Sequence, residues 1–402
     1  MHPIPQCDSP HHKPVVVLRY DEGMKKFDAA IAGGGLIGGS IALELARAGL
    51  RVGVFDRQEP GREASWAGAG ILSAAPENPG MIPAVPLCKA SLALYPGFVA
   101  MVEETSGQRA GFRPKGTIEA LFSRDARTEL STLIALHHGL GLKAEPLRAE
   151  DARELEPALS EEMEVGVLRP DEAAVDNRAL TRAVLEAARR SGAEIFSNCG
   201  VESIWRDGDK YRRCAGLVLQ NEKVEAAWTI IAAGCFSAGL EEVEAYAPVR
   251  PAKGQMIALR AEELKIERVL WSEKIYLVPR NDGRILAGAT VEYVGFDKGT
   301  TAGGIEKILS AAIELAPGLA AARIEETWAG LRPDSPDHLP ILGPTDLEGL
   351  LIATGHFRSG ILLAPITAKL MREWITEHRF SVEWERFSPL RFEAQAAKKT
   401  TA

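Results

Sequence analysis

The chain has 402 residues, of which 46% are hydrophobic and 25% charged, a balance typical of a globular protein with about two domains. Its formal net charge of -8 leaves no basic surplus to neutralise phosphates, which argues against nucleic acid as a partner. The five cysteines form no CxxC pair, which argues against a zinc site and favours a reducing compartment.

Residues 1–26 form a polar, proline-containing stretch before the first predicted strand. For the stretch with His2, His11 and His12 we predict a mobile or loosely docked extension and no metal site. Met24 directly precedes the strand and is our predicted true start. The stretch lacks the features of a signal peptide, and we expect no apolar run of about 18 residues, the length that crosses a bilayer. The default expectation is a cytoplasmic protein without integral membrane association.

Residues 27–56 predict a strand, a glycine-rich turn, a helix and a second strand. The turn carries the spacing Gly33-x-Gly35-x-x-Gly38. In a nucleotide-binding βαβ unit, Gly33 permits the tight turn, Gly35 lets a pyrophosphate approach the backbone, and Gly38 lets the helix lie against the strand. The glycine spacing alone is weak evidence for nucleotide binding, but here the strand before it and the helix after it are both present.

Two further features of this unit predict a dinucleotide. The N–H groups of Leu36 and Ile37 are unpaired donors at a helix N-terminus, where the helix dipole favours a phosphate. Asp56 closes the second strand and is placed to accept hydrogen bonds from the ribose of an adenosine. The loop at 57–72 is dense in small residues, as expected where the backbone lies along a large flat ligand.

The middle of the chain predicts a second domain inserted into the first. The apolar strand at 229–234 belongs in a parallel core sheet, where Gly234 leaves room for a cofactor. Between 253 and 290, three short strands follow one another without helices, which indicates an antiparallel sheet. Helices are predicted at 88–106, 126–140, 150–159 and 178–190, and further strands at 115–122, 194–196 and 200–202.

The last third is predicted to return to the nucleotide domain. The segment at 350–365 reads as an apolar strand, a glycine, and then Ser359-Gly360 opening a helix. The arrangement is the same as at Gly33: peptide N–H groups at a helix N-terminus are presented to an electron-rich partner. We expect disorder in the lysine- and alanine-rich end at 391–402.

Several motifs together resemble one family. They are GREASWAGAGIL at 61–72, the Asp176-Asn177 pair, WAGLRP at 328–333 followed by DHLPILGP, and ATGHFRSGILLAP at 353–365. Their combination resembles the D-amino-acid oxidase superfamily of flavoproteins, and within it the glycine oxidases of thiamine biosynthesis. The resemblance implies an α/β fold, a FAD-binding Rossmann-like domain with an inserted antiparallel-sheet substrate domain.

The resemblance also implies noncovalent FAD and the residues that hold it. Val201 falls on a position whose backbone contacts the adenine, although a plain buried strand residue is an equal alternative. The implied and predicted cofactor contacts are Gly33, Gly35, Leu36, Ile37, Gly38, Asp56, Arg57, Ala64, Ser65, Ala69, Gly70, Ile71, Val201, Gly234, Gly330, His356, Phe357, Arg358, Ser359, Gly360, Ile361 and Leu362.

The substrate-facing residues implied are Arg332, Arg358 and Tyr276. Arginine suits a carboxylate clamp because its planar fork offers two parallel donors and does not titrate near neutral pH. The alternative for Arg332 is an interdomain salt bridge, and for Tyr276 a rim tyrosine packed in its strand. We favour a structural or flavin-contacting role for His356 over that of a base, and expect no essential side-chain base.

Four positions depart from the resembled pattern. Asp56 stands where glutamate is usual and Ile71 where methionine is common, and both exchanges keep the role. Ser359 replaces a frequent asparagine, and Lys274 enters the site strand in place of another polar residue. The last two affect the expected substrate range more than the fold.

The expected activity is oxidation of glycine or a similar small amino acid by oxygen, giving an imine, then glyoxylate and ammonia, with hydrogen peroxide, and supplying thiazole synthesis. A D-amino-acid dehydrogenase, a sarcosine-type oxidase and a non-catalytic flavin-binding subunit stay open as alternatives, and a homo-oligomer is possible. We assign 27–106, 172–247 and 324–390 to the FAD domain, and 107–171 and 248–323 to the substrate domain.

Overall fold

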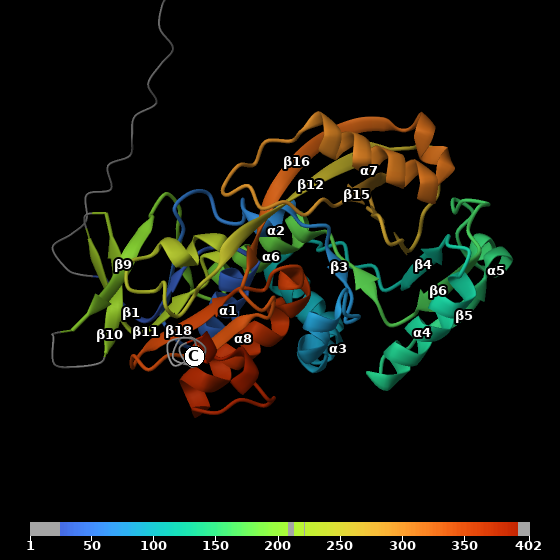
Figure 1. The fold of residues 1–402 in the computed structure, drawn as a ribbon. Helices are drawn as coiled ribbons and strands as arrows, with labels where there is room; N and C mark the ends of the chain where they lie inside the picture. Colours follow the sequence, from blue (N-terminus) through green and yellow to red (C-terminus); the bar gives the residue numbers. More distant parts are fainter. Residues whose placement is uncertain (1–24, 208–212, 221, 393–402) are drawn as a thin grey trace, which may run out of the picture.

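The computed structural model describes residues 25–207, 213–220 and 222–392 (Figure 1). The predictions for the N-terminal extension, with His2, His11, His12 and the start at Met24, lie outside these residues. Most of the tail predicted at 391–402 lies outside them as well.

The first of two eight-stranded sheets is built around a buried parallel core. Its strand order is β17-β18-β11-β1-β2-β8, in which β1 pairs in parallel with β2 and β11, and β11 with β18. Strand β10 pairs antiparallel with β11, and β9 pairs antiparallel with β10. The predicted parallel core is therefore confirmed. The bounds are β1 (Lys26–Ala32), β2 (Val52–Phe55), β8 (Glu194–Phe196), β9 (Val201–Arg206), β10 (Cys214–Leu219), β11 (Lys223–Ile231), β17 (Ile341–Pro344) and β18 (Leu350–Thr354).

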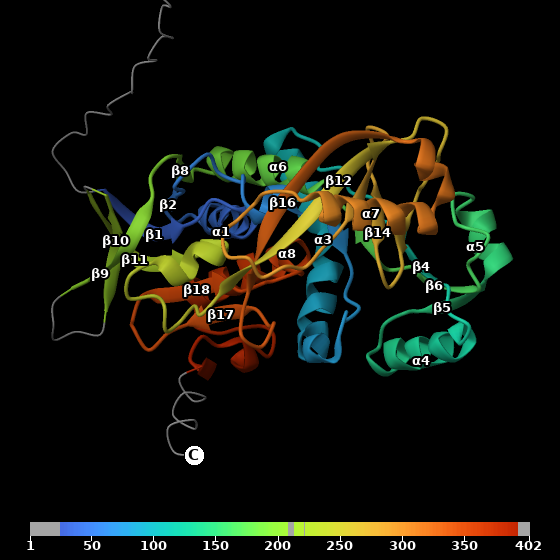
Figure 2. The same cartoon turned by 45° about the horizontal axis from the view of Figure 1, so that its top comes forward.

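Strand β1 is buried on both faces, which explains its uninterrupted apolar sequence. Ala29 and Ile31 belong to the core under the helices, whereas Ala30 and Ala32 belong to a second core on the opposite face of the sheet. Four helices pack against one another on the first face, as Figure 2 shows. They are α1 (Leu36–Arg47), α3 (Val85–Ser106), α6 (Asn177–Arg190) and α8 (Gly360–Glu377).

Helix α3 corrects one sequence expectation. Together with the short 3-10 helix η1 (Pro79–Ala84) it forms the segment Pro79–Ser106, which contains an 18-residue window with a mean hydropathy of 1.5 and, by length and composition only, could cross a membrane. The expectation that no apolar run is long enough is therefore wrong. In the structure, Tyr95 and Val102 are fully buried, and α3 packs on α6 and α8 as part of the core.

The second sheet has the order β16-β12-β15-β14-β13-β4-β6-β5. It is antiparallel as predicted, except that β13 pairs with β4 in parallel. Helix α7 (Ala302–Leu315) covers one face, while α4 (Ala126–Gly139) and α5 (Ala149–Leu155) lie at the β5 end (Figure 1). The strands are β4 (Thr117–Leu121), β5 (Glu145–Arg148), β6 (Val165–Arg169), β12 (Arg250–Arg260), β13 (Val269–Trp271), β14 (Tyr276–Pro279), β15 (Arg284–Gly288) and β16 (Arg323–Asp334).

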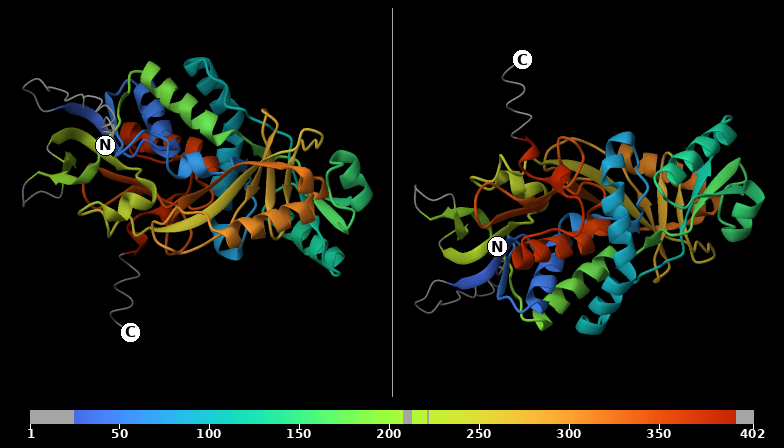
Figure 3. Two further views of the ribbon diagram at one scale, coloured as in Figure 1. Left: turned by 90° about the horizontal axis from the view of Figure 1, so that it is seen from above. Right: turned by 90° about the horizontal axis from the view of Figure 1, so that it is seen from below.

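The two sheets lie side by side along the molecule, with β12 and β16 reaching from the second toward the first (Figure 3). Because β16 pairs with β12 along most of its length, residues 324–334 belong to the second sheet. The predicted return to the FAD domain at 324 is therefore placed too early. The other domain boundaries stay predictions. The remaining elements are α2 (Ala64–Ala67), η2 (Gly234–Gly239), η3 (Pro317–Ala321), η4 (Glu385–Phe387) and the small pair β3 (Ile71–Leu72) with β7 (Ala173–Ala174).

Candidate active site

A cavity of about 1300 Å³ lies where the two sheets meet. Its wall includes the end of β1, the N-termini of α1 and α8, the loop at 61–77, and parts of β12, β14 and β16. Every residue predicted to contact cofactor or substrate lines this cavity, with the single exception of Gly38. The structure therefore brings together segments from residue 32 to residue 362.

The glycine-rich turn lies at one end of the cavity. Gly33 has φ +106°, and a Cβ there would meet the Ala232 carbonyl oxygen at 2.5 Å. Gly38 faces away from the cavity, and a Cβ on it would lie 2.0 Å from the Gly33 oxygen, so it serves the close packing of helix on strand. Gly35 is the N-cap of α1, and the Leu36 N–H that follows donates to Ser65 Oγ at 2.8 Å. The prediction that this N–H is an unpaired donor is therefore wrong.

Asp56, at the end of β2, is held by the backbone. Its two carboxylate oxygens accept from the Gly34 N–H at 2.8 Å and the Gln58 N–H at 3.0 Å, while burial raises its pKa. The neighbouring Arg57 pairs with Glu63 at 2.6 Å, and its guanidinium lies 3.4 Å from the ring centroid of Phe236. These contacts fix a carboxylate and a flat apolar surface at the end of the cavity where an adenosine is expected.

The second helix N-terminus, at β18 and α8, forms the opposite part of the wall. Gly355 and Phe357 both have positive φ, +69° and +46°, which turns the chain sharply before Ser359 caps α8. His356 is buried, and its Nε2 lies 3.1 Å from the Thr367 hydroxyl. Burial lowers the pKa of His356 to about 3, so the imidazole is neutral at ordinary pH and a poor proton acceptor. This supports the structural role preferred from the sequence.

Arg332 projects from β16 into the cavity. Its Nη1 donates to the Thr290 oxygen at 3.2 Å, and among the residues that the structure describes no carboxylate forms an ion pair with it. The interdomain salt bridge considered as the alternative is absent from this described part. Burial lowers the pKa of Arg332, with Tyr276 opposing that shift, and even so the group stays cationic. A partly buried arginine that faces the cavity is suited to an incoming carboxylate.

Tyr276 starts β14 beside Arg332. Its hydroxyl lies 3.4 Å from Met256 Sδ, and burial raises its pKa, with Arg332 and Arg358 opposing that rise. The hydroxyl is therefore protonated at ordinary pH and available as a donor. Lys274, two residues earlier, pairs with Glu314 of α7 at 2.7 Å, which directs its charge away from Tyr276.

Arg358 differs from Arg332 because it already has an anionic partner. Its Nη2 lies 2.5 Å from a carboxylate oxygen of Glu77, which also lines the cavity. Burial raises the pKa of Glu77, while Arg358, Arg332 and Arg169 lower it. Glu77 was not anticipated, because no pattern in the sequence connects the loop at 73–78 with the turn before α8.

The site residues fit FAD on structural grounds. The cavity ends in a cradle that a Cβ at Gly35 would partly fill, with Ser65 Oγ 3.1 Å from a Cβ placed there. Helix N-termini provide N–H donors at both the phosphate and the ring ends. The volume accommodates a dinucleotide together with a small substrate.

Comparisons with known proteins agree with this geometry. The family model described as FAD dependent oxidoreductase matches residues 28–374. The bifunctional protein ThiO/ThiG of Trichormus variabilis is 35% identical over 374 residues, covering 92% of this chain and 56% of that protein, so the chain spans just over half of its length. The glycine oxidase of Bacillus licheniformis is 32% identical, covering 92% of this chain and 99% of that enzyme.

A solved structure is similar throughout the fold. The crystal structure of glycine oxidase from Geobacillus kaustophilus superimposes with a TM-score of 0.85 at 31% identity, covering 90% of this chain and 98% of that one. The FAD-type fold expected from the sequence is thereby confirmed. This chain belongs to the family of FAD-dependent oxidoreductases that includes the glycine oxidases.

Proposed function

We propose that the chain is an oxidase of glycine or a similar small amino acid. The observation that carries this proposal is Arg332, a partly buried cation without a carboxylate partner among the described residues, facing the cavity beside Tyr276. Such a group binds a substrate carboxylate without first having to break an existing ion pair. The similarity to two glycine oxidases supports a small amine as the rest of the substrate.

The residues of this chain orient the substrate. Arg332 takes the carboxylate, and the Tyr276 hydroxyl donates to the same group, which leaves the α-carbon facing the interior of the cavity. Arg358 adds positive charge nearby while it remains paired with Glu77. The two helix N-termini and the loop at 64–71 would hold FAD, which would supply the hydride acceptor and the route of the electrons to oxygen, with hydrogen peroxide as the product.

No described side chain is placed to act as an essential base. His356 bonds with Thr367 and its low pKa keeps it neutral, while Glu77 is engaged with Arg358. The substrate amine is therefore bound in its neutral form, so that its lone pair assists loss of hydride from the α-carbon. The imine that forms is hydrolysed to glyoxylate and ammonia.

An anaerobic titration of the FAD-bound protein tests this proposal directly. Glycine, sarcosine and D-alanine are added in turn while the flavin absorbance is followed, and air is then admitted. Bleaching by glycine with peroxide on reoxidation supports the oxidase. Bleaching without rapid reoxidation favours a dehydrogenase, and no bleaching by any of the three rejects a small amino-acid substrate.

We further propose a cytoplasmic location and a role in supplying the imine for thiazole synthesis. Support comes from the bifunctional ThiO/ThiG relative, about half of which matches this chain. Expression in a bacterium lacking its own glycine oxidase should restore growth without added thiazole. Growth that still depends on thiazole would reject the pathway while leaving the oxidase proposal intact.

A further inference from the structure

Arg280 is a buried arginine that lies behind the cavity wall. It follows β14, is 7% exposed, and is absent from the residues that line the cavity. Its Nη2 donates to the Ala69 carbonyl oxygen and to Asn177 Oδ1, both at 2.8 Å. Ala69 belongs to the loop that faces the cavity, so this side chain connects the second sheet to the predicted flavin loop.

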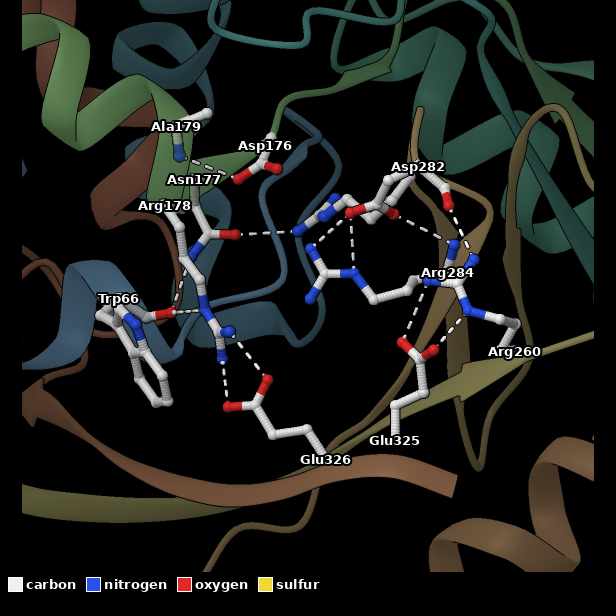
Figure 4. Close-up of polar contacts among 11 residues, drawn as sticks. Trp66, Asp176, Asn177, Arg178, Ala179, Arg260, Asp282, Arg284, Glu325 and Glu326 are labelled. Carbon is white, nitrogen blue, oxygen red and sulfur yellow. Dashed lines mark hydrogen bonds and ion pairs between the residues drawn. The ribbon is translucent and has the colours of Figure 1, made fainter. Parts of the chain in front are cut away.

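The Asp176-Asn177 pair completes this connection. Asp176 caps α6 by accepting from the Ala179 N–H at 2.9 Å, which fixes the start of the helix (Figure 4). From there Asn177 Nδ2 donates to the carbonyl oxygens of Ser65 at 2.8 Å and Trp66 at 3.0 Å. Figure 4 also shows Arg178 reaching the Trp66 oxygen while it pairs with Glu326 at 2.8 Å. Several carbonyl groups of the loop are thus drawn away from the cavity.

The orientation of the Ala69–Gly70 peptide follows from these contacts. In a trans peptide, the carbonyl and the following N–H point in opposite directions. Since the Ala69 oxygen points to Arg280 behind the wall, the Gly70 N–H points toward the cavity. Within the described ranges, that N–H makes no hydrogen bond. A buried backbone donor of this kind ordinarily has a partner, and here the partner must come from the cavity.

The charge of Arg280 is incompletely compensated. No carboxylate of the described residues forms an ion pair with it, and its Nη1 is buried without a hydrogen-bond partner. The charged groups around it are Asp176, Asp282, Arg178 and Arg284, two of each sign, and Asp282 is itself paired with Arg284. Burial lowers the pKa of Arg280 to about 10, which still leaves it cationic at neutral pH.

We propose that Arg280 is a positioning residue for the cofactor. Arg280 directs the Gly70 N–H into the cavity and places a buried positive charge behind that peptide, so that FAD bound there is more easily reduced. The physical reason is that reduced flavin gathers negative charge, and a nearby cation in a low-dielectric region stabilises it. The inference rests on FAD binding and not on glycine being the substrate.

The test compares two variants that differ mainly in charge. Arg280→Gln and Arg280→Lys both retain a donor for the Ala69 oxygen, but only the lysine keeps the positive charge. The midpoint potential of the bound flavin is measured by slow chemical reduction against a redox dye, without any amino-acid substrate. We expect a more negative potential for Arg280→Gln and a nearly unchanged one for Arg280→Lys. With glycine, flavin reduction should slow about tenfold in Arg280→Gln while the apparent affinity stays within about twofold.

Two further variants keep the result decisive. Arg148→Met removes an arginine of β5 that is paired with Asp151, does not line the cavity and is not among the charges around Arg280, and its flavin potential should match the wild type. Asn177→Asp retains Arg280 and adds an anion beside it, so its potential should fall even if Arg280→Gln does not hold FAD. An unchanged potential in both Arg280→Gln and Asn177→Asp, accompanied only by a lower melting temperature, would overturn the proposal. If glycine reduced the flavin in none of the variants, that result would contradict the proposed function alone and not the role of Arg280.

Discussion

The guanidinium group of Arg332 lies directly against the backbone of Gly254 on the neighbouring strand β12. A Cβ built on Gly254 would lie 2.2 Å from Nη1 and 2.4 Å from Nη2, closer than any atoms can approach without displacement. The absence of a side chain at 254 therefore decides where the charge of Arg332 is held. The two residues are in direct contact, although 78 positions separate them in the chain.

This contact predicts the effect of Gly254→Ala. The added methyl group must displace the guanidinium, so we expect the KM for glycine to rise at least about tenfold, while FAD occupancy is unchanged. Steady-state kinetics and the flavin spectrum measure the two quantities. The matched control is Gly97→Ala in α3, where an added Cβ meets nothing within 4 Å. A KM within about twofold of the wild type would show that Arg332 is not the clamp, or that it tolerates displacement.

Removal of either cavity arginine should have unequal effects. Arg332→Leu is expected to raise the KM for glycine by about 100-fold, because two charge-assisted hydrogen bonds contribute roughly 3 kcal/mol. Arg358→Leu should raise it less, since Arg358 is already paired with Glu77. Steady-state kinetics of both purified variants give the comparison, with bound flavin as evidence of folding. If the Arg358 variant lost more affinity than the Arg332 variant, the roles of the two arginines would have to be exchanged.

Glu77→Gln should strengthen the binding of carboxylates. The carboxylate of Glu77 neutralises Arg358, and its removal makes the cavity more positive. We expect the dissociation constant of glycolate, a carboxylate without an amine, to fall about fivefold, or ~1 kcal/mol. Perturbation of the flavin spectrum on titration measures it. Glu314→Gln, which removes the partner of Lys274 instead, is the control. Weaker glycolate binding in Glu77→Gln would mean that Glu77 chiefly holds Arg358 in place.

The buried His356 predicts a dependence of stability on pH. Its pKa is lowered to about 3 by burial, whereas in the unfolded chain it is about 6.5. Between these values the unfolded chain binds the additional proton, so stability is full above pH 6.5 and falls as the pH decreases toward 3. From pH 6.5 to pH 5 this histidine should account for about 2 kcal/mol of the free energy of unfolding.

The comparison of wild type with His356→Gln isolates that contribution. Denaturant unfolding at pH 7 and pH 5 should show a smaller acid-induced loss in the variant, although the variant starts less stable because its packing is changed. Turnover should persist in His356→Gln, since the neutral imidazole bonds with Thr367 and abstracts no proton in the proposed mechanism. Complete loss of turnover in a folded, FAD-bound variant would reassign His356 to the chemistry.

Structural features that depend on residues close together in the sequence could be predicted from it, whereas contacts between distant segments could not. The turn at Gly33–Gly38 was predictable from its glycine spacing, and the requirement at Gly38 is local, because a Cβ there would lie 2.0 Å from the Gly33 oxygen. The parallel core followed from the apolar sequences of β1 and β11. The placement of β16 was less accessible, since a strand pattern does not state which sheet the strand joins, and only pairing with β12 places it in the second.

The contacts missed were those between distant loops. Glu77 follows a segment without regular structure, and its pairing with Arg358 depends on how the two sheets meet. The role of Gly254 was equally hidden, because its neighbours in sequence read as an ordinary strand. Arg280 had no signal at all: a buried arginine behind a loop looks, in the sequence, like any arginine in a hairpin turn.

Strand β16 has a mechanical consequence. Trp328, Gly330 and Arg332 alternate along it and so point to one side, where Trp328 Nε1 bonds with the Ala67 oxygen at 3.0 Å and Gly330 lies against Ala67. The same strand thus contacts the predicted flavin loop through Trp328 and Gly330 and carries Arg332, the proposed carboxylate clamp. The distance between the loop contacts and Arg332 is set by the rise of a β-strand. In the proposed mechanism, this strand therefore fixes the alignment of substrate with cofactor before either one binds.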